Sequence, residues 1–153
     1  MDWERCAVGA TDGEITINVA GNHGQSSSVL PMLSACSDVA PTSTYVATET
    51  VRLSSLDQLL SGKDLGRSTF LKVDVQGYES AVLEGATGLI DAGAFVGMQL
   101  ELSLVPLYEG AMTWREGVDR VEAFCMTLMA IQLAFRDPRT GQMLQVDAVF
   151  FRS

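Results

Sequence analysis

The residue of this sequence most suited to chemistry is an aspartate near the end of an apolar run. Asp74 lies in the run 69–75 and is followed by Gln76 and Gly77. A carboxylate at this place is desolvated, paired or exposed at a strand end, so Asp74 is a candidate to orient a ligand or to accept a proton. Capping of the following helix would explain the same residue, and both interpretations stay open. Gly77 either lets the backbone pass close to a ligand or only relieves the turn.

Two glutamates further along the chain are candidates of different weight. Glu79 is expected in the first turn of a helix, where the helix dipole alone accounts for a carboxylate. Glu101 interrupts an apolar strand, on the same face as Gln99 and Ser103. A buried carboxylate needs a partner, which here is a lysine, a loop amide or a bound ligand. If that face is exposed to solvent, Glu101 needs no partner and does not indicate a site.

The only histidine, His23, lies in the polar loop 21–28. An imidazole titrates near neutral pH and would suit a general base, although a loop histidine is also often merely solvated. Ser26, Ser27 and Ser28 lack a Gly-x-Ser-x-Gly elbow, so a hydrolase using Asp74 and His23 has no nucleophile arrangement. The sequence has no metal-binding motif, no P-loop and no Gly-x-Gly-x-x-Gly pattern, so no metal site is predicted.

Hydrophobic periodicity predicts the elements that position these residues. Alternation at Ile15, Ile17 and Val19 indicates a strand, and further strands are expected over 45–53, 69–75 and 95–104. Helices are expected from Ser55 to Gly62, from 78 to 90, and from Thr113 onward. The third helix has an apolar stripe formed by Val118, Val121, Cys125 and Leu128.

The order of these elements predicts an α/β fold. The segments 131–136 and 143–151 complete it as a C-terminal antiparallel hairpin on a mostly parallel sheet. We expect a single domain over 1–153. Ligands of such sheets bind at the carboxyl ends of the strands, which puts Asp74, Gln76 and Gly77 on the rim of the site and 105–110 beside them.

Composition limits the partners. The 153 residues carry 10 Lys and Arg against 19 Asp and Glu, a net charge of −9. An acidic surface repels phosphate, so neither nucleic acid nor an anionic membrane is an expected partner, and a neutral or cationic small molecule is. No apolar run of about 18 residues exists. Three cysteines and a charged N-terminus without an apolar signal core favour a cytoplasmic protein.

The block Phe70–Glu79, followed by Val82–Ala86, resembles the FkbM family of S-adenosylmethionine-dependent methyltransferases. Further segments resemble the family in the same order along the chain: Ala7–Gly9 with Asp12 and Gly13, Ser26–Ser28, Val51–Leu53 with Leu56 and Asp57, Leu100–Leu102, and Asp147–Arg152.

The resemblance implies an incomplete class I methyltransferase (Rossmann-like) sheet. The family's glycine-rich loop and ribose-binding acidic residue lie upstream of the segment that resembles Ala7–Gly9. The chain therefore looks like the C-terminal two thirds of a methyltransferase domain, without two βα units of roughly 30 residues each.

The resemblance also implies an activity and its residues. Methyl transfer from S-adenosylmethionine to a hydroxyl of a sugar or natural product is expected, with proximity and a base as the main contributions. Cofactor contacts are implied at Ala7, Val8, Asp74, Gln76 and Gly77, with Asp74 nearest the reacting methyl. Glu79, Glu101 and the loop carrying His23 and Ser26 are implied on the substrate side.

Two hypotheses of different class remain. One is a methyltransferase domain completed by an N-terminal segment. The other is a non-catalytic α/β module that self-associates, since the loss of two βα units would uncover apolar faces.

Overall fold

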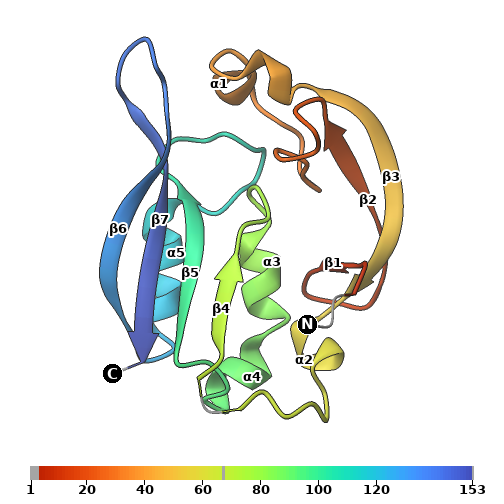
Figure 1. Ribbon diagram of the computed structural model, residues 1–153, viewed down its shortest axis with the longest axis vertical. Coiled ribbons are helices and arrows are strands. Elements are labelled where there is room, and N and C mark those ends of the chain that lie inside the picture. Colours follow the sequence, from red (N-terminus) through yellow and green to blue (C-terminus); the bar gives the residue numbers. More distant parts are fainter. Residues whose placement is uncertain (1–3, 67, 153) are drawn as a thin grey trace.

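The computed structural model describes residues 4–66 and 68–152 (Figure 1). Its elements combine strands and short helices throughout the chain, as an α/β class requires. In chain order they are β1 (Ala7–Val8), β2 (Gly13–Ala20), α1 (Ser34–Ser37), the 3-10 turn η1 (Pro41–Ser43), β3 (Tyr45–Ser54), α2 (Leu56–Leu59), β4 (Phe70–Val73), α3 (Glu79–Glu84), α4 (Thr87–Asp91), β5 (Gly97–Ser103), α5 (Trp114–Glu122), β6 (Met126–Arg136) and β7 (Met143–Arg152).

The strands form two sheets rather than one. Three strands pair in the order β1-β3-β2, and four pair in the order β4-β5-β7-β6. In the described chain β1–β3 and β4–β5 are parallel pairs, whereas β2–β3, β5–β7 and β6–β7 are antiparallel. The expectation of a mostly parallel sheet is therefore wrong, because β3 runs back along the whole of β2 and adds antiparallel pairing beyond the predicted C-terminal hairpin.

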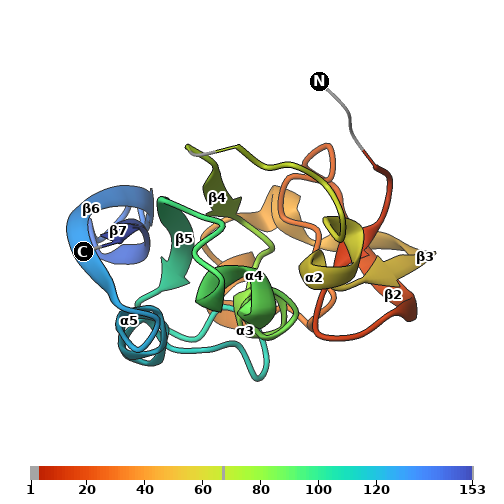
Figure 2. The same cartoon turned by 90° about the horizontal axis from the view of Figure 1, so that it is seen from below.

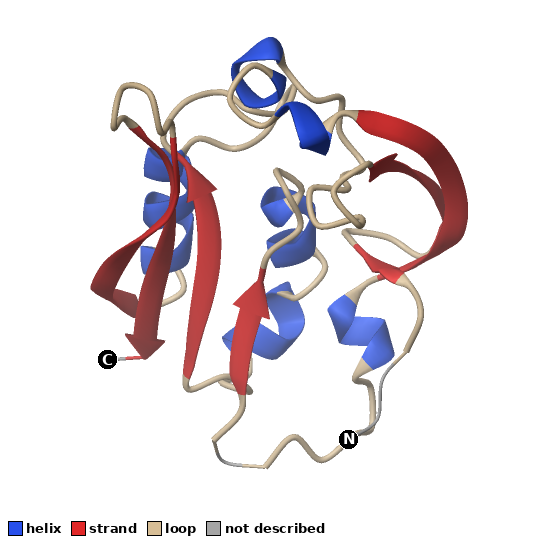
Figure 3. Ribbon diagram, turned by 45° about the horizontal axis from the view of Figure 1, so that its top comes forward, coloured by secondary structure: helices blue, strands red, loops and turns tan. Residues whose placement is uncertain are grey.

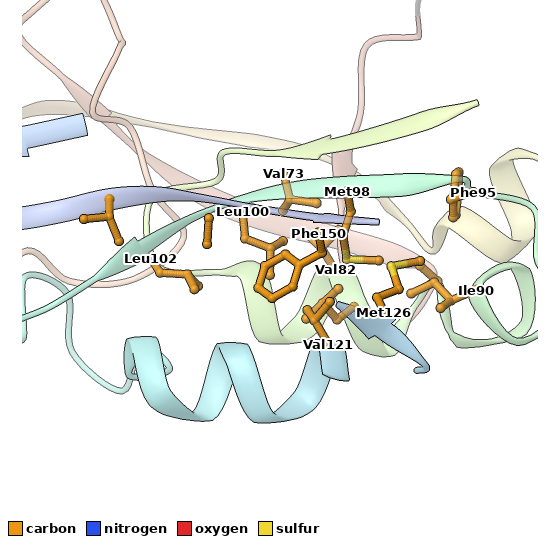
Figure 4. Packing of buried hydrophobic residues seen from close by; sticks show 14 residues of the cluster. Val73, Val82, Ile90, Phe95, Met98, Leu100, Leu102, Val121, Met126 and Phe150 are labelled. Atoms are coloured by element: carbon orange, nitrogen blue, oxygen red, sulfur yellow. The ribbon is translucent and has the colours of Figure 1, made fainter. Parts of the chain in front are cut away.

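The helices lie mainly on one face of the four-stranded sheet. Figure 2 shows α3, α4 and α5 together below β4–β7, while β2 and β3 curve away beside them (Figure 3). Apolar side chains fill the space between helices and sheet (Figure 4). This core is made of residues that alternate along β5 and β7 and of helix residues facing them, among them Met98, Leu100, Leu102, Val146, Ala148, Phe150, Val82, Leu83, Ile90 and Val121. Within the described part, no helix has the length and apolarity needed to cross a bilayer.

Two predicted helices end earlier than expected. The helix expected over 78–90 is broken at Gly85 and Ala86 into α3 and α4. The helix that begins at Thr113 has its capping box with Glu116 but ends at Glu122. Cys125 has a φ of 58°, and Leu128 belongs to β6. The predicted helical stripe is therefore wrong beyond Val121, because the chain pairs with β7 as a strand from Met126 onward.

The break at Gly85 is where the helical layer contacts the three-stranded sheet. A Cβ at Gly85 would overlap the carbonyl oxygen of Gly9, which directly follows β1. Asp57 spans the same junction, because its backbone N–H donates to Gly85 O and its carboxylate accepts from the N–H groups of Gly88 and Leu89 at 2.9 Å each. Backbone contact at a glycine and these hydrogen bonds tie the two sheets together.

Gly85→Ala is expected to lower the free energy of unfolding by about 3 kcal/mol, at the upper end of overpacking costs, since the added methyl group meets backbone rather than a side chain. Urea denaturation measures the change. Glu84→Ala, one residue earlier and exposed, is the control and should shift stability by no more than about 0.5 kcal/mol. Equal stabilities of the two variants would contradict the close contact.

Candidate functional site

The turn after β4 carries Asp74 and requires an unusual backbone. Gln76 and Gly77 have φ values of 51° and 98°, in the left-handed region. A Cβ on Gly77 would lie 2.9 Å from Cβ of Tyr108 and 3.1 Å from Cβ of Ala111. Both the conformation and the close approach of Tyr108 and Ala111 therefore require glycine at this position.

The carboxylate of Glu79 stabilises this turn by hydrogen bonds to its backbone. The residue is 3% exposed, and its Oε1 accepts hydrogen bonds from the backbone N–H groups of Gly77 at 3.1 Å and Val75 at 3.4 Å. Burial raises the pKa of Glu79, which the two backbone donors oppose. These contacts make Glu79 a brace of the turn. Gly77 is buried beside it.

The side chain of Gln76 bridges the carboxylates of Asp74 and Glu101. The Nε2 of Gln76 donates to Oδ1 of Asp74 at 2.8 Å and to Oε2 of Glu101 at 2.7 Å. Gln145 on β7 donates to the same Glu101 oxygen at 2.9 Å, and Tyr108 donates its hydroxyl to Oε1 of Gln76 at 2.8 Å. The partner expected for Glu101 is thus a pair of side-chain amides, one of them from the loop after β4.

Burial first and the charge of Asp74 second raise the pKa of Glu101, against the opposing effect of the Gln76 hydrogen bond, to about 7. Asp74 itself is more exposed and forms an ion pair with Lys72, whose Nζ lies 3.1 Å from Oδ2. A carboxyl group that titrates near neutral pH can accept a proton and release it again under ordinary conditions.

These residues line a cleft of about 560 Å³ at the carboxyl ends of β4 and β5. Its walls are carboxylates, carboxamides and hydroxyl groups with a few apolar residues: Asn22, Gln25, Ser26, Cys36, Ala40, Thr42, Ser43, Asp74, Gln76, Glu101, Tyr108, Phe135 and Gln145. The loop 21–28 contributes to this wall, but His23 is exposed and is not among the lining residues.

A second cavity, of about 270 Å³, adjoins the first. It is lined by Cys6, Ala7, Val8, Ile17, Ser27, Ser28, Val29, Asp74, Val75 and Tyr78. Asp74 lines both cavities. We call the first the amide cleft and the second the apolar groove. The structure therefore brings Ala7 and Val8 to one side of Asp74 and Gln76 and Glu101 to the other.

Sequence reasoning missed Tyr108 and Gln145 as members of the site. Tyr108 lies within 105–110, which was expected at the end of a strand, but no pattern singles it out there. Gln145 had no comparable signal, since its approach to Glu101 depends on the register between β5 and β7. Within residues 4–66 and 68–152, no group of three or more His, Cys, Asp or Glu is arranged to hold a metal ion.

Asp74→Asn is expected to lower the pKa of Glu101 below about 7, because the variant removes a like charge and leaves an amide in its place. Carbon-13 NMR of labelled glutamate carboxyl groups measures the titration. Asp91→Asn, at an exposed position of α4, serves as the control. A Glu101 titration unchanged by Asp74→Asn would mean that the two carboxylates are not coupled.

The model of the methyltransferase FkbM domain matches residues 2–144. No curated protein and no solved structure gives a match to the chain. Since the matched residues make up most of the 153, the chain belongs to the FkbM methyltransferase family.

Proposed function

We propose that this chain takes part in S-adenosylmethionine-dependent methylation of a hydroxyl group on a sugar or natural product. The observation that supports this most is the position of Asp74, which lines both the apolar groove and the amide cleft. A methyltransferase must hold the methyl donor and the acceptor on opposite sides of the transferred methyl group. The two cavities adjoin at Asp74, so a donor in one and an acceptor in the other would meet there.

The apolar groove fits part of the proposed cofactor. Ala7 and Val8 offer an apolar wall suited to the adenine ring, and the Asp74 carboxylate offers a negative charge to a sulfonium. When bound, S-adenosylmethionine would supply a methyl group to the acceptor oxygen and leave as the neutral thioether. The residues lining the groove include no lysine or arginine to hold the cofactor's own carboxylate.

Glu101 is the proposed acceptor of the hydroxyl proton. Its Oε2 accepts hydrogen bonds from both Gln76 and Gln145, whereas no hydrogen bond of the described residues engages Oε1. The free oxygen can take the proton that the substrate hydroxyl loses as its oxygen forms the new bond to carbon. Its pKa of about 7 suits this exchange.

The amide cleft suits a polyhydroxylated, uncharged substrate. Four carboxamides and several hydroxyl groups line it, and no lysine, arginine or histidine is among its lining residues. Such side chains both donate to and accept from substrate hydroxyls. Two carboxylates in the same wall disfavour a phosphorylated or carboxylated substrate.

The rest of the cofactor site is proposed to come from a segment N-terminal to this domain or from a second copy of the chain. β4 and β1 each lie at the end of their sheet, so one edge of each is without a strand partner among the described residues. An unpaired edge is a ready template for a further strand. We further propose that the protein works in the cytoplasm, in keeping with its free Cys6, Cys36 and Cys125.

The second candidate, a non-catalytic module that self-associates, is favoured by β6. This edge strand exposes Met129, Ile131 and Leu133 by 49–64%. Calorimetric titration of the complete gene product with S-adenosylmethionine separates the candidates, since one-site binding supports the enzyme and absence of binding at millimolar ligand supports the module.

Glu101→Gln is expected to lower the rate of methyl transfer at least about 100-fold, because the amide cannot take the hydroxyl proton. The assay follows labelled methyl groups from S-adenosylmethionine into a panel of neutral sugars, using the complete product of the gene. The unaltered protein should gain activity as pH rises through about 7, where Glu101 loses its proton, and the variant should lack this rise.

Glu84→Gln, on the exposed side of α3, is the matched control and should retain both the rate and its pH dependence. An unaltered pH profile in Glu101→Gln would remove Glu101 from the reaction. Preference for phosphorylated over neutral sugars would contradict the proposed substrate class.

A further inference from the structure

Gln76 is held in a backbone conformation that a glutamine rarely adopts. Its φ of 51° is one of three positive values among the described residues other than glycine, the others being His23 and Cys125. Such strain persists only where neighbouring contacts stabilise it, and it is enriched at functional sites. The buried Ser28 supplies one such contact, because its hydroxyl donates to Gln76 O at 2.7 Å and accepts from the N–H of Leu30 at 3.0 Å.

The side-chain amide of Gln76 is oriented by its partners on both sides. Asp74 and Glu101 offer acceptor oxygens, so the NH₂ group must face them, one hydrogen to each. On the other side Tyr108 donates to Oε1. Tyr108 is 2% exposed, and burial raises the pKa of its hydroxyl, so that the proton needed for this donation stays in place.

Together with Gln145, this amide determines which oxygen of Glu101 is available. Both amides donate to Oε2, which saturates that atom and fixes the carboxylate plane. Oε1 is left without a partner among the described residues, on a side chain that lines the amide cleft. The strained turn after β4 is what brings the Gln76 amide within 2.7 Å of a carboxylate on the neighbouring strand.

We propose that Gln76 is the positioning residue of the amide cleft, which uses its two amide hydrogens to hold Asp74 and Glu101 side by side and to present Oε1 of Glu101 to the bound hydroxyl. The role of Glu101 in proton transfer rests on the proposed function. The positioning itself is a property of the unliganded protein and can be measured without catalysis.

The charges around Glu101 predict the direction in which its pKa changes when the Gln76 hydrogen bond is lost. Asp74, Asp147 and Glu79 all disfavour a negative Glu101, whereas the charge of Lys72, which is paired with Asp74, favours it. The Gln76 hydrogen bond favours the ionised form against these carboxylates. Loss of that bond should therefore raise the pKa of Glu101.

Gln76→Asn is the test variant, because asparagine tolerates a positive φ better than glutamine and keeps an amide, yet is one methylene too short to bridge both carboxylates. Carbon-13 NMR titration of the carboxyl groups should show the pKa of Glu101 raised by about one unit. Gln58→Asn, on the exposed side of α2, is the matched control and should leave the titration unchanged. Tyr108→Phe, which frees the amide on its other side, should shift the same titration in the same direction.

A Glu101 titration that is unchanged in folded Gln76→Asn would overturn the inference. Should Gln76→Asn fail to fold, Tyr108→Phe decides, with no shift counting against the inference. In the methylation assay, Gln76→Asn should lower kcat with KM little changed. If the protein transfers no methyl group but the titration shifts, the positioning role stands and the proposed function fails; if methyl transfer occurs without a shift, the positioning role fails.

Discussion

Gln76 and Gly77 turn the chain sharply at the end of β4, through two successive residues with positive φ. Three features of the candidate site depend on this turn. It leaves Asp74 at the boundary of two cavities, brings the Gln76 amide to Glu101, and lets the loop with Tyr108 pack closely against Gly77. The buried Glu79, which accepts from the backbone of the same turn, helps to offset the cost of the strain.

Two opposing effects determine the state of Glu101. Desolvation and neighbouring carboxylates favour its protonated form, while amide donors favour its ionised form. Desolvation and the neighbouring carboxylates outweigh the donors, so the pKa rises to about 7. Replacing either amide by an apolar side chain would leave the desolvated Glu101 carboxylate with fewer hydrogen-bond donors. A buried polar network stabilises a site only when most of its members are paired. These hydrogen bonds also make the two oxygens of Glu101 different, because both amides donate to Oε2.

The site further depends on contact between two sheets that share no strand. Gly85 and Asp57 join the helices of the four-stranded sheet to the three-stranded sheet. The helices α2 and α4 of this junction lie at the end opposite the cleft loops (Figure 1). At the cleft end, Ser28 of the loop after β2 reaches Gln76. Because these contacts hold both ends, Ala7 and Val8 line a groove that also includes Asp74. Strand pairing alone would not bring these residues together.

The sequence alone determined the strand that directly precedes Asp74, the helix cap at Thr113 and the membership in a methyltransferase family, since periodicity, caps and motifs are local properties. Only the tertiary structure decided that Gln145, 44 residues from Glu101, donates to it. That contact depends on strand register, which no local pattern encodes. The tertiary structure also ended a helix at Gly85, because backbone from β1 occupies the space that a side chain would need.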